Sequence, residues 1–285
     1  MKPKTEYIDV NGVILEHPVC VSTFSRGLMY GDGIFETMHY YNGSILFSED
    51  HFERLEKGLH VLSMQMPAGL TIKKMFASVR KLADLNGRAD HARIRLQLTR
   101  NDGGHYAPLT RKTSYILTVT SLKEEIYALN KNGLHVDVCT SVHLPVNELS
   151  NLKTCNVLPY IMAAIYAKEN MLDDCLLLNA KNKIAEATSS NVFSINGGVI
   201  FTPSLSDGCV DGVMRRNIIS IARYLNFKVK EQSMSVNDLV VAEEIFLTNV
   251  IRGIQFVGIF NGIKKKINSA RLIHGGLVEL VKSIR

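Results

Sequence analysis

The chain lacks long apolar runs and closely spaced cysteines. Its longest apolar runs, such as "DLVVA" and "CLLL", are far too short to span a bilayer, and the start "MKPKTEYIDV" holds no apolar stretch of signal-peptide length. We therefore expect a cytoplasmic protein with no membrane association. The five cysteines are scattered and form no CxxC, which argues against a disulfide framework and against a structural zinc site, so no metal is expected.

Two phosphate-binding signatures are also absent. The sequence has neither a GxGxxG motif nor a Walker loop, and its strands and helices do not alternate regularly as in a Rossmann domain. The net charge is +6, but the one dense basic run, "IKKKINSAR", adjoins a predicted turn at Asn261-Gly262 and is explained by solvent exposure. We expect no nucleic-acid partner, and a mild positive field suits small anionic substrates.

The composition predicts a globular α+β protein. The 285 residues, 46% hydrophobic and 21% charged, suffice for one large or two smaller domains. In the first half, Asn11-Gly12 and Asn42-Gly43 each join two strand-like runs, which is a hairpin signal. Helices are expected from Ser48, as N-cap, and across "TIKKMFASVRKLADLNG", and "ARIRLQLT" and "SYILTVTSL" alternate like strands. The polar stretch "KEEIYALNKNG" predicts a linker at 123–133 between domains at 1–122 and 134–285.

The second half is predicted to be rich in strands that adjoin through short turns. Strands are expected in "LHVDVCTSV", "CLLLN", "IAEAT", "NVFSINGGVIFTP", "FKVKEQ", "EEIFLTN" and "IQFVGIF". Helices are expected at about 158–170, 212–225 and 269–284.

Lys153, in "ELSNLKTCNVLPY", is set among small, apolar and amide residues. Desolvation lowers the pKa of a lysine, and the neutral amine can then attack a cofactor aldehyde. A strand-end lysine whose stem covers apolar surface explains the local stretch at least as well. Glu186 ends a predicted strand just before the hydroxyl-rich turn Thr188–Asn191. A carboxylate there suits either the surface or the N–H of a pyridinium ring.

Two further features suit an anionic group. Gly212 precedes a predicted helix from Val213, and the free N–H groups and dipole of a helix start attract anions, although most helix starts bind nothing. Arg54 follows Phe52 on a predicted helix. It either faces inward to a phosphate or pairs with Asp50 on the surface.

Taken in order, six stretches resemble the class-IV aminotransferase family, the fold-type-IV pyridoxal-phosphate enzymes. This family includes branched-chain aminotransferases, D-amino acid aminotransferases and 4-amino-4-deoxychorismate lyases. The stretches are "YGDGIFET" (Tyr30 to Thr37), "EDHFERL" (Glu49 to Leu55), "LKTCNVL" (Leu152 to Leu158), "EATSSNVF" (Glu186 to Phe193), "GVMRR" (Gly212 to Arg216) and "EEIFLTN" (Glu243 to Asn249). The resemblance implies a small α/β N-terminal domain, a larger C-terminal domain with the cofactor between them, and a homodimer in which partner loops cover the site.

The resemblance also implies roles for single residues. Lys153 forms the internal aldimine with pyridoxal 5'-phosphate and later moves the proton between Cα and the cofactor C4′, while Glu186 binds the ring nitrogen. Arg54 binds the phosphate, aided by the helix start at Val213. Val157 and Leu158 stand where some relatives have a tyrosine for the ring oxygen, so the turn after Glu186 is expected to bind that oxygen. The other implied cofactor contacts are Val210, Met214, Thr188, Ser189, Ser190, Asn191, Thr248, Asn249 and Val250.

The substrate carboxylate needs a cationic or hydrogen-bonding trap, for which Arg100 and Arg95 are candidates. Arg100 falls at the end of its strand, where relatives with such a trap place an arginine. Tyr30, His39 and His105 are further candidates to line the substrate site, from this subunit or its partner.

The chain departs from the branched-chain enzymes in several places. It has "FETMH" where they typically show "FEGIR", and Met214 and Val250 replace threonines that commonly bind phosphate. We therefore expect amino transfer between an α-amino acid and a 2-oxo acid, although not by a branched-chain enzyme of the usual kind. The alternative is a 4-amino-4-deoxychorismate lyase, which eliminates pyruvate and gives 4-aminobenzoate. A binding protein that has kept the fold without the activity is a third possibility.

Overall fold

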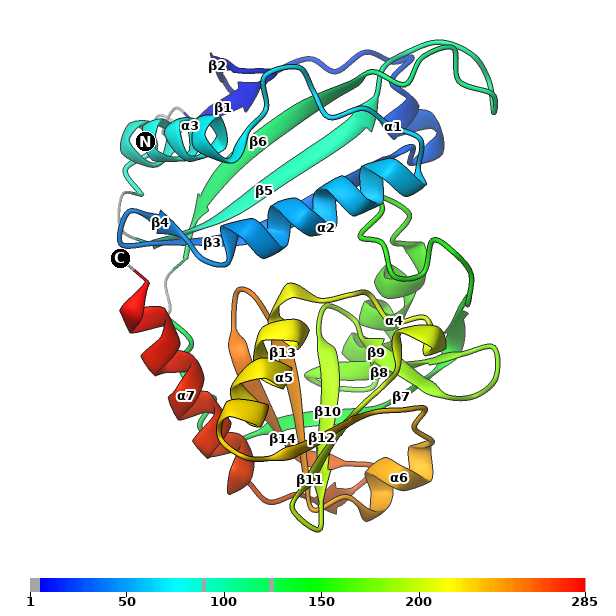
Figure 1. The fold of residues 1–285 in the computed structure, drawn as a ribbon. Coiled ribbons are helices and arrows are strands. Elements are labelled where there is room, and N and C mark those ends of the chain that lie inside the picture. Colours follow the sequence, from blue (N-terminus) through cyan, green and yellow to red (C-terminus); the bar gives the residue numbers. More distant parts are fainter. Residues whose placement is uncertain (1–5, 89–90, 123–125, 285) are drawn as a thin grey trace. The chain divides into compact units, whose positions relative to one another are not determined.

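The computed structural model describes residues 6–88, 91–122 and 126–284 (Figure 1). The chain divides into two compact units. Unit 1 comprises Met1–Glu124, Leu152–Asn156 and Ile284–Arg285, and unit 2 comprises Glu125–Asn151 and Val157–Ser283. Residues 123–125 of the predicted linker lie outside the described residues, and the predicted domain bounds stay a prediction.

Unit 1 is built on a six-stranded antiparallel sheet in the order β2-β1-β6-β5-β3-β4. The strands are β1 (Tyr7–Val10), β2 (Val13–Glu16), β3 (Gly33–Tyr41), β4 (Ser44–Ile45), β5 (His91–Arg100) and β6 (Thr113–Ser121). Both predicted hairpins are confirmed, because Asn11 and Asn42 have positive φ and each is followed by a glycine with positive φ.

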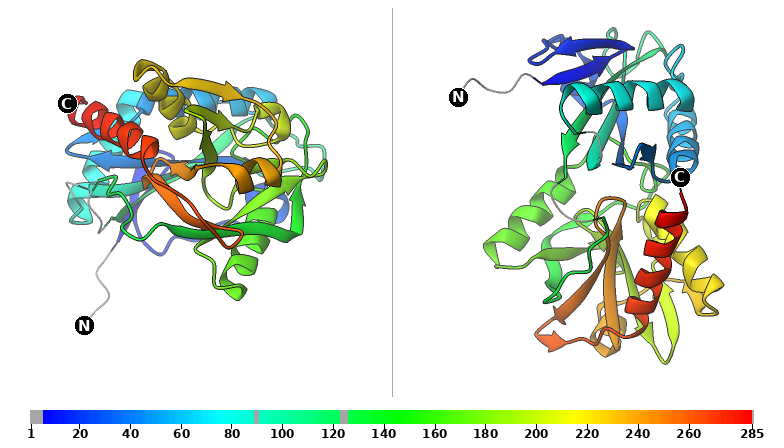
Figure 2. Two further views of the ribbon diagram at one scale, coloured as in Figure 1. Left: turned by 90° about the horizontal axis from the view of Figure 1, so that it is seen from below. Right: turned by 90° about the vertical axis from the view of Figure 1, so that its left-hand side faces the viewer.

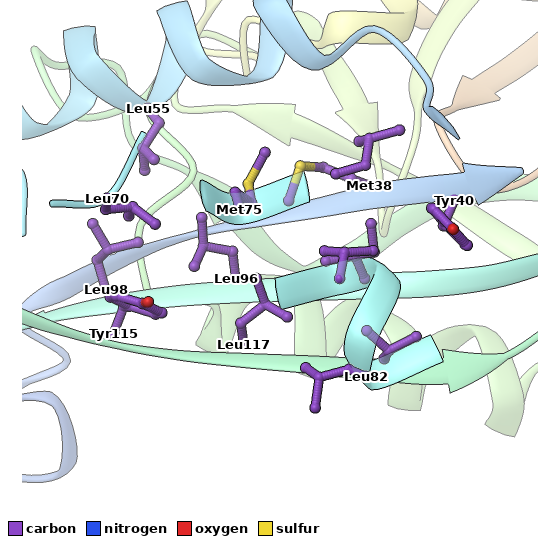
Figure 3. Packing of buried hydrophobic residues seen from close by; sticks show 14 of the residues in the cluster. Met38, Tyr40, Leu55, Leu70, Met75, Leu82, Leu96, Leu98, Tyr115 and Leu117 are labelled. Carbon is purple, nitrogen blue, oxygen red and sulfur yellow. The ribbon is translucent and has the colours of Figure 1, made fainter. Parts of the chain in front are cut away.

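Helices α2 (Ser48–Val61) and α3 (Ile72–Leu85) cover one face of this sheet (Figures 1 and 2). Leu55 of α2 and Met75 of α3 pack with Met38, Leu96 and neighbouring apolar side chains of the sheet (Figure 3). Since successive strand residues point to opposite faces, the odd-numbered residues of β3 and β5 lie on the other face. The predicted N-cap of α2 is wrong by one residue: Phe47, in the left-handed region, precedes the helix, and Ser48 is its first residue.

Unit 2 contains a nine-stranded mixed sheet. Its main path runs β12-β11-β10-β13-β14-β7-β8-β9, with β15 paired to β14. The strands are β7 (Leu134–Leu144), β8 (Asp174–Asn179), β9 (Ile184–Ala187), β10 (Asn191–Asn196), β11 (Val199–Thr202), β12 (Lys228–Glu231), β13 (Glu244–Asn249), β14 (Gly253–Phe260) and β15 (Ile263–Lys264). The pairs β7/β8, β7/β14 and β11/β12 are parallel.

The three predicted helices of the second half are present as α4 (Leu158–Glu169), α5 (Val213–Tyr224) and α7 (Ser269–Ser283). α4 packs on β7 and β8, and α7 lies against α5 and β14 (Figure 2). The sequence patterns did not predict α1 (Arg26–Tyr30), α6 (Val236–Val241) or the turn Leu205–Asp207. These segments are three to six residues long, too short to show helical periodicity. Among the described residues, no helix combines the length and apolar character needed to cross a membrane.

Candidate active site

Lys153 lies on a short extended segment that pairs with the start of β3. The Phe35 N–H donates to the Lys153 carbonyl oxygen at 3.0 Å, and the Cys155 N–H donates to the Gly33 carbonyl oxygen at 2.9 Å. Thr154 forms an antiparallel bridge with Ile34. These bonds fix the backbone of Lys153 on the sheet of unit 1, and its side chain is half-buried.

The ring of Phe35 carries two cationic side chains. The Lys153 Nζ lies 4.6 Å from the ring centroid and the Arg95 Cζ lies 4.0 Å from it. Both cations sit in the favourable range for attraction to an aromatic face. Arg95 also donates to the Gln97 side-chain oxygen at 3.0 Å, and burial lowers its pKa from the ordinary value. Phe35 thus contacts both the Lys153 amine and the Arg95 guanidinium on the face opposite α2 and α3.

Arg100 points to the other face of β5, because it is five residues from Arg95. Its Nε donates to the Asp32 carboxylate at 2.9 Å, and its Nη2 donates to the Leu62 carbonyl oxygen at 2.8 Å. The same carboxylate oxygen accepts from the Nε of Arg26 at 2.8 Å. Arg100 is 6% exposed. Its guanidinium therefore holds the end of β5 to the end of α2, within a buried ion-pair network.

The other three predicted substrate residues occupy different surroundings. Tyr30 is half-buried, with the Arg26 guanidinium 5.0 Å from its ring centroid. His105 is exposed, and its carbonyl oxygen accepts from Arg26 at 2.5 Å. His39 is buried and stacks on His91, with their Nε2 atoms 2.6 Å apart. The structure thus brings Tyr30 and His105 near Arg26, while His39 lies further along β3, next to the hairpin with β4.

Arg54 of α2 is held by a buried carboxylate. Its Nε donates to Glu36 Oε1 at 2.8 Å and its Nη2 to Oε2 at 2.5 Å. His51 Nδ1 also lies 2.7 Å from Glu36 Oε2. Burial opposes the ionisation of Glu36, but the charges of Arg54 and His51 and their hydrogen bonds outweigh it and lower the Glu36 pKa to about 2. Burial lowers the pKa of His51, against the attraction of Glu36.

In unit 2, Glu186 is a buried carboxylate at the end of β9. It accepts from the Tyr160 hydroxyl at 2.7 Å, from the Val210 N–H at 3.1 Å and from the Asn191 side-chain amide at 3.2 Å. Asn191 also donates to the Val210 carbonyl oxygen at 3.0 Å. The predicted residues Val210 and Asn191 are therefore directly joined to Glu186.

The turn after Glu186 is tied to its neighbours by side-chain hydrogen bonds. The Thr188 hydroxyl donates to the buried Asp174 carboxylate at 2.6 Å, and burial raises the Asp174 pKa. Ser189 is exposed, and Ser190 accepts from the Asn249 side chain at 3.0 Å. Asn249 in turn accepts from the N–H groups of 251 and 252, and the Val250 carbonyl oxygen accepts from the Tyr127 hydroxyl. These bonds bring the predicted turns at 188–191 and 248–250 together.

The start of α5 lies beside this pair of turns. Gly212 is the N-cap residue and has no side chain with which to cap the helix, and Val213 and Met214 are buried in the first turn. A Cβ on Gly212 would clash with the side-chain oxygen of Asn191, and Asn191 is held in place by its bonds to Glu186 and Val210, so glycine suits this close approach. Asn191 pairs with Thr248 across β10 and β13. The Thr248 hydroxyl is buried and has no hydrogen-bond partner among the described residues.

A family comparison explains why these features occur together. The model of the class IV aminotransferases matches residues 33–259. The chain belongs to the class IV aminotransferases. It is 32% identical to an aminodeoxychorismate lyase of Bacillus subtilis, over 86% of this chain and 83% of the relative. Enzymes of this family depend on pyridoxal phosphate.

Solved structures of branched-chain aminotransferases share the fold. The Escherichia coli enzyme superposes with a TM-score of 0.87 at 23% identity, covering 97% of this chain and 95% of that chain. The enzyme of the archaeon Thermoproteus uzoniensis, solved with norvaline, has a TM-score of 0.86 at 23% identity and covers 97% and 95%. The predicted α+β fold of fold type IV is therefore confirmed.

The residues of unit 2 fit the cofactor. A buried hydroxyl without a described partner at Thr248 and an uncapped helix start at Val213 are donors that a phosphate satisfies. Glu186 is a carboxylate of the kind that holds a protonated pyridine nitrogen. No group of three or more histidine, cysteine, aspartate or glutamate side chains in the described part of the chain is arranged to hold a metal ion.

Sequence reasoning missed Glu36, His51 and Tyr160. Glu36 had a signal, because it shares the apolar face of "IFETMHYY" with Ile34, Met38 and Tyr40, and a buried carboxylate needs a partner. Tyr160 had none, since it is 26 residues from Glu186 and no local pattern links the two.

Proposed function

We propose that this protein is a pyridoxal-phosphate-dependent aminotransferase that moves an amino group between an α-amino acid and a 2-oxo acid. The observation that carries the proposal is the shared ring of Phe35, over which the Lys153 amine and the Arg95 guanidinium both lie. An α-amino acid reacts at the carbon next to its carboxylate, so the reacting lysine needs a cation close by. Arg95, which contacts the same ring as Lys153, is the candidate for that cation.

Each cofactor role is proposed for a residue with suitable surroundings. The Lys153 amine would hold the cofactor through its aldehyde and would move the proton at the substrate Cα. Glu186 holds the ring nitrogen. The N–H groups at the start of α5 and the Thr248 hydroxyl bind the phosphate, and Glu36 keeps Arg54 rigid for the same task. The bound cofactor supplies an electron sink for the bonds at Cα.

Arg95 is a better candidate than Arg100 for the substrate carboxylate. The Nε, Nη1 and Nη2 atoms of Arg100 all donate, to Asp32 and to three backbone carbonyl oxygens, so a substrate carboxylate would have to replace one of these bonds. Arg95 contacts a neutral amide and an aromatic ring, and a carboxylate can join these without displacing an opposite charge. Tyr30, His39 and His105 stay predictions.

A second candidate function is the elimination of pyruvate from 4-amino-4-deoxychorismate. It is favoured by the 32% identity to the Bacillus subtilis lyase. The lyase would use the same cofactor, lysine and carboxylate, and its substrate also carries carboxylates.

We further propose a cytoplasmic homodimer. The apolar side chains of Leu158, Ile161, Met162 and Ile165 on α4 are 45–72% exposed. A contiguous exposed apolar helix face is typical of an interaction surface, and a second copy of this chain is the partner that the family resemblance implies. Light scattering of the purified protein measures the mass directly.

The experiment that tests the proposed function uses the purified protein with added pyridoxal phosphate. We expect a visible absorbance band that borohydride abolishes, its loss in Lys153→Ala, and its retention in Lys168→Ala, which removes an exposed lysine of α4. A panel of D- and L-amino acids should then convert the cofactor to its amine form. A panel without conversion, together with pyruvate release from aminodeoxychorismate, would replace the aminotransferase by the lyase. A colourless protein would overturn both.

A further inference from the structure

Tyr160 lies in the first turn of α4, the helix that follows the Lys153 segment. Its hydroxyl donates to Glu186 Oε1 at 2.7 Å, the shortest of the three donor–acceptor distances described for this carboxylate. The helix is fixed behind it, because Ala163 and Ala167 are buried against β7 and β8 and the ring of Tyr160 packs on the same cluster. The phenol is thus presented to Glu186 by a rigid element.

The direction of this hydrogen bond is set by electrostatics. Burial and the negative charge of Glu186 raise the pKa of Tyr160 well above its ordinary range. The phenol therefore stays protonated over the working pH range of a protein, and the carboxylate oxygen accepts. A donor to an ionised carboxylate stabilises its charged form and makes it a weaker base.

We propose that Tyr160 is a positioning residue for the cofactor ring nitrogen: by donating to Glu186, it weakens the basicity of the carboxylate and keeps the shared proton on the nitrogen. This inference rests on the proposed function, because it requires Glu186 to face a bound pyridine ring. A proton located on the nitrogen rather than on the carboxylate is what makes the ring an effective electron sink. Tyr160 acts through Glu186 and is not itself assigned a contact with the cofactor.

The test is the ¹⁵N resonance of the ring nitrogen, measured with ¹⁵N-labelled pyridoxal phosphate bound to the wild-type protein and to variants at one fixed pH. In Tyr160→Phe, Glu186 becomes more basic and attracts the proton. We expect the resonance to move from the pyridinium value toward the neutral-pyridine value, with a dissociation constant for the cofactor that rises about threefold to tenfold. Tyr166→Phe is the matched control, since Tyr166 is on the same helix and packs on the same cluster.

A graded series guards against a folding defect in one variant. Replacing Tyr160 by 3-fluorotyrosine makes the phenol a stronger donor, so the resonance should move the opposite way from that of Tyr160→Phe. The proposal would be overturned if the ring-nitrogen resonance of Tyr160→Phe were identical to that of the wild type. It would also be overturned if Tyr160→Phe and Tyr166→Phe displaced this resonance equally. Failure of the wild-type protein to bind the cofactor would instead overturn the proposed function, and the two failures are therefore distinct.

Discussion

Each of the two units buries a carboxylate on a strand, and the two carboxylates differ in the groups that donate hydrogen bonds to them. Glu36 in β3 is 2% exposed and is bonded by Arg54 and His51, of which Arg54 is a permanent cation. Glu186 in β9 is 4% exposed and accepts from Tyr160, Asn191 and the Val210 N–H, none of which carries a charge. The Arg54 guanidinium offsets the charge of Glu36 within the protein, whereas the three donors described for Glu186 are neutral groups that stabilise its charged form.

Glu36 and Glu186 illustrate two roles of a buried carboxylate, one in stabilising the fold and one in binding a ligand. A carboxylate paired with a buried arginine contributes to the fold and gains little from a ligand. A carboxylate that accepts hydrogen bonds from neutral donors is stabilised in its charged form, which is the form that attracts a cationic group such as a pyridinium N–H. Within unit 1 the same contrast exists for cations, because Arg100 is paired with Asp32 and Arg95 is held by Gln97 and Phe35.

The largest effect is expected for Glu36→Gln. The substitution leaves the buried Arg54 without its carboxylate, and breaking a buried pair on one side costs about 3–5 kcal/mol of unfolding free energy. Urea unfolding of the cofactor-free protein measures the loss. Glu56→Gln removes an exposed carboxylate from α2, the helix that carries Arg54, and should change the unfolding free energy by less than about 0.5 kcal/mol. Equal losses in the two variants would mean that Glu36 is not a structural charge.

The dependence of stability on acid pH tests the structural role of Glu36 in a second way. The Glu36 pKa is lowered to about 2 in the folded protein, so the carboxylate contributes stability above its unfolded value of 4.5 and loses it as the pH falls toward 2. The difference corresponds to about 3 kcal/mol. His51, whose pKa is also lowered, adds a loss that begins below 6.5, because the unfolded histidine takes up the proton first. We expect the stability of Glu36→Gln to fall less steeply than that of the wild type between pH 4.5 and pH 2; parallel curves would contradict the ion pair.

The fold could be predicted from the sequence where local signals are strong. Asn-Gly turns fixed the hairpins of unit 1, and helical periodicity located α2, α3, α4, α5 and α7. The motifs identified the family, but they could not show which side chains hold one another. Alternation along β5 does place Arg95 and Arg100 on opposite faces, yet only the structure shows that Asp32 pairs with Arg100.

The remaining part of the site depends on contacts between distant segments. Arg54 was predicted to face a phosphate or to pair with Asp50, and both stay predictions; the sequence did not indicate its bond to Glu36, which lies 18 residues away on another element. The hydroxyl-rich turn at 188–191 was assigned to the cofactor, and the Thr188 hydroxyl is bonded to Asp174. Hydrogen bonds between elements are decided by strand register and helix packing, which no short stretch of sequence encodes.

Arg95→Gln and Arg100→Gln test the contrast between the two arginines. If Arg95 holds the substrate carboxylate, its loss lowers kcat/KM for an α-amino acid by about tenfold to a hundredfold, because a charge-assisted hydrogen bond contributes about 1.5–3 kcal/mol. Stability should hardly change. Arg100→Gln should lower the unfolding free energy, since it breaks the pair with Asp32, while the folded fraction keeps its kcat/KM. Steady-state kinetics and urea unfolding of both variants measure these two effects. A loss of kcat/KM in Arg100→Gln, with kcat/KM kept in Arg95→Gln, would assign the substrate carboxylate to Arg100.

The smallest effect is expected for Thr248→Val, which removes the buried hydroxyl without a described partner and keeps the β-branched shape. The cofactor-free protein should be unchanged or more stable by up to about 1 kcal/mol, because an unsatisfied polar group is replaced by an apolar one. The dissociation constant for pyridoxal phosphate should rise about tenfold, or ~1.4 kcal/mol, through loss of a hydrogen-bond donor to the phosphate.

Thr202→Val is the control, since the Thr202 hydroxyl donates to the Val192 carbonyl oxygen at 2.9 Å. That variant should lose stability and keep its cofactor affinity. If Thr248→Val destabilises the cofactor-free protein as much as Thr202→Val does, the Thr248 hydroxyl stabilises the fold. The buried polar groups of unit 2 would then have the same structural role as Glu36 in unit 1.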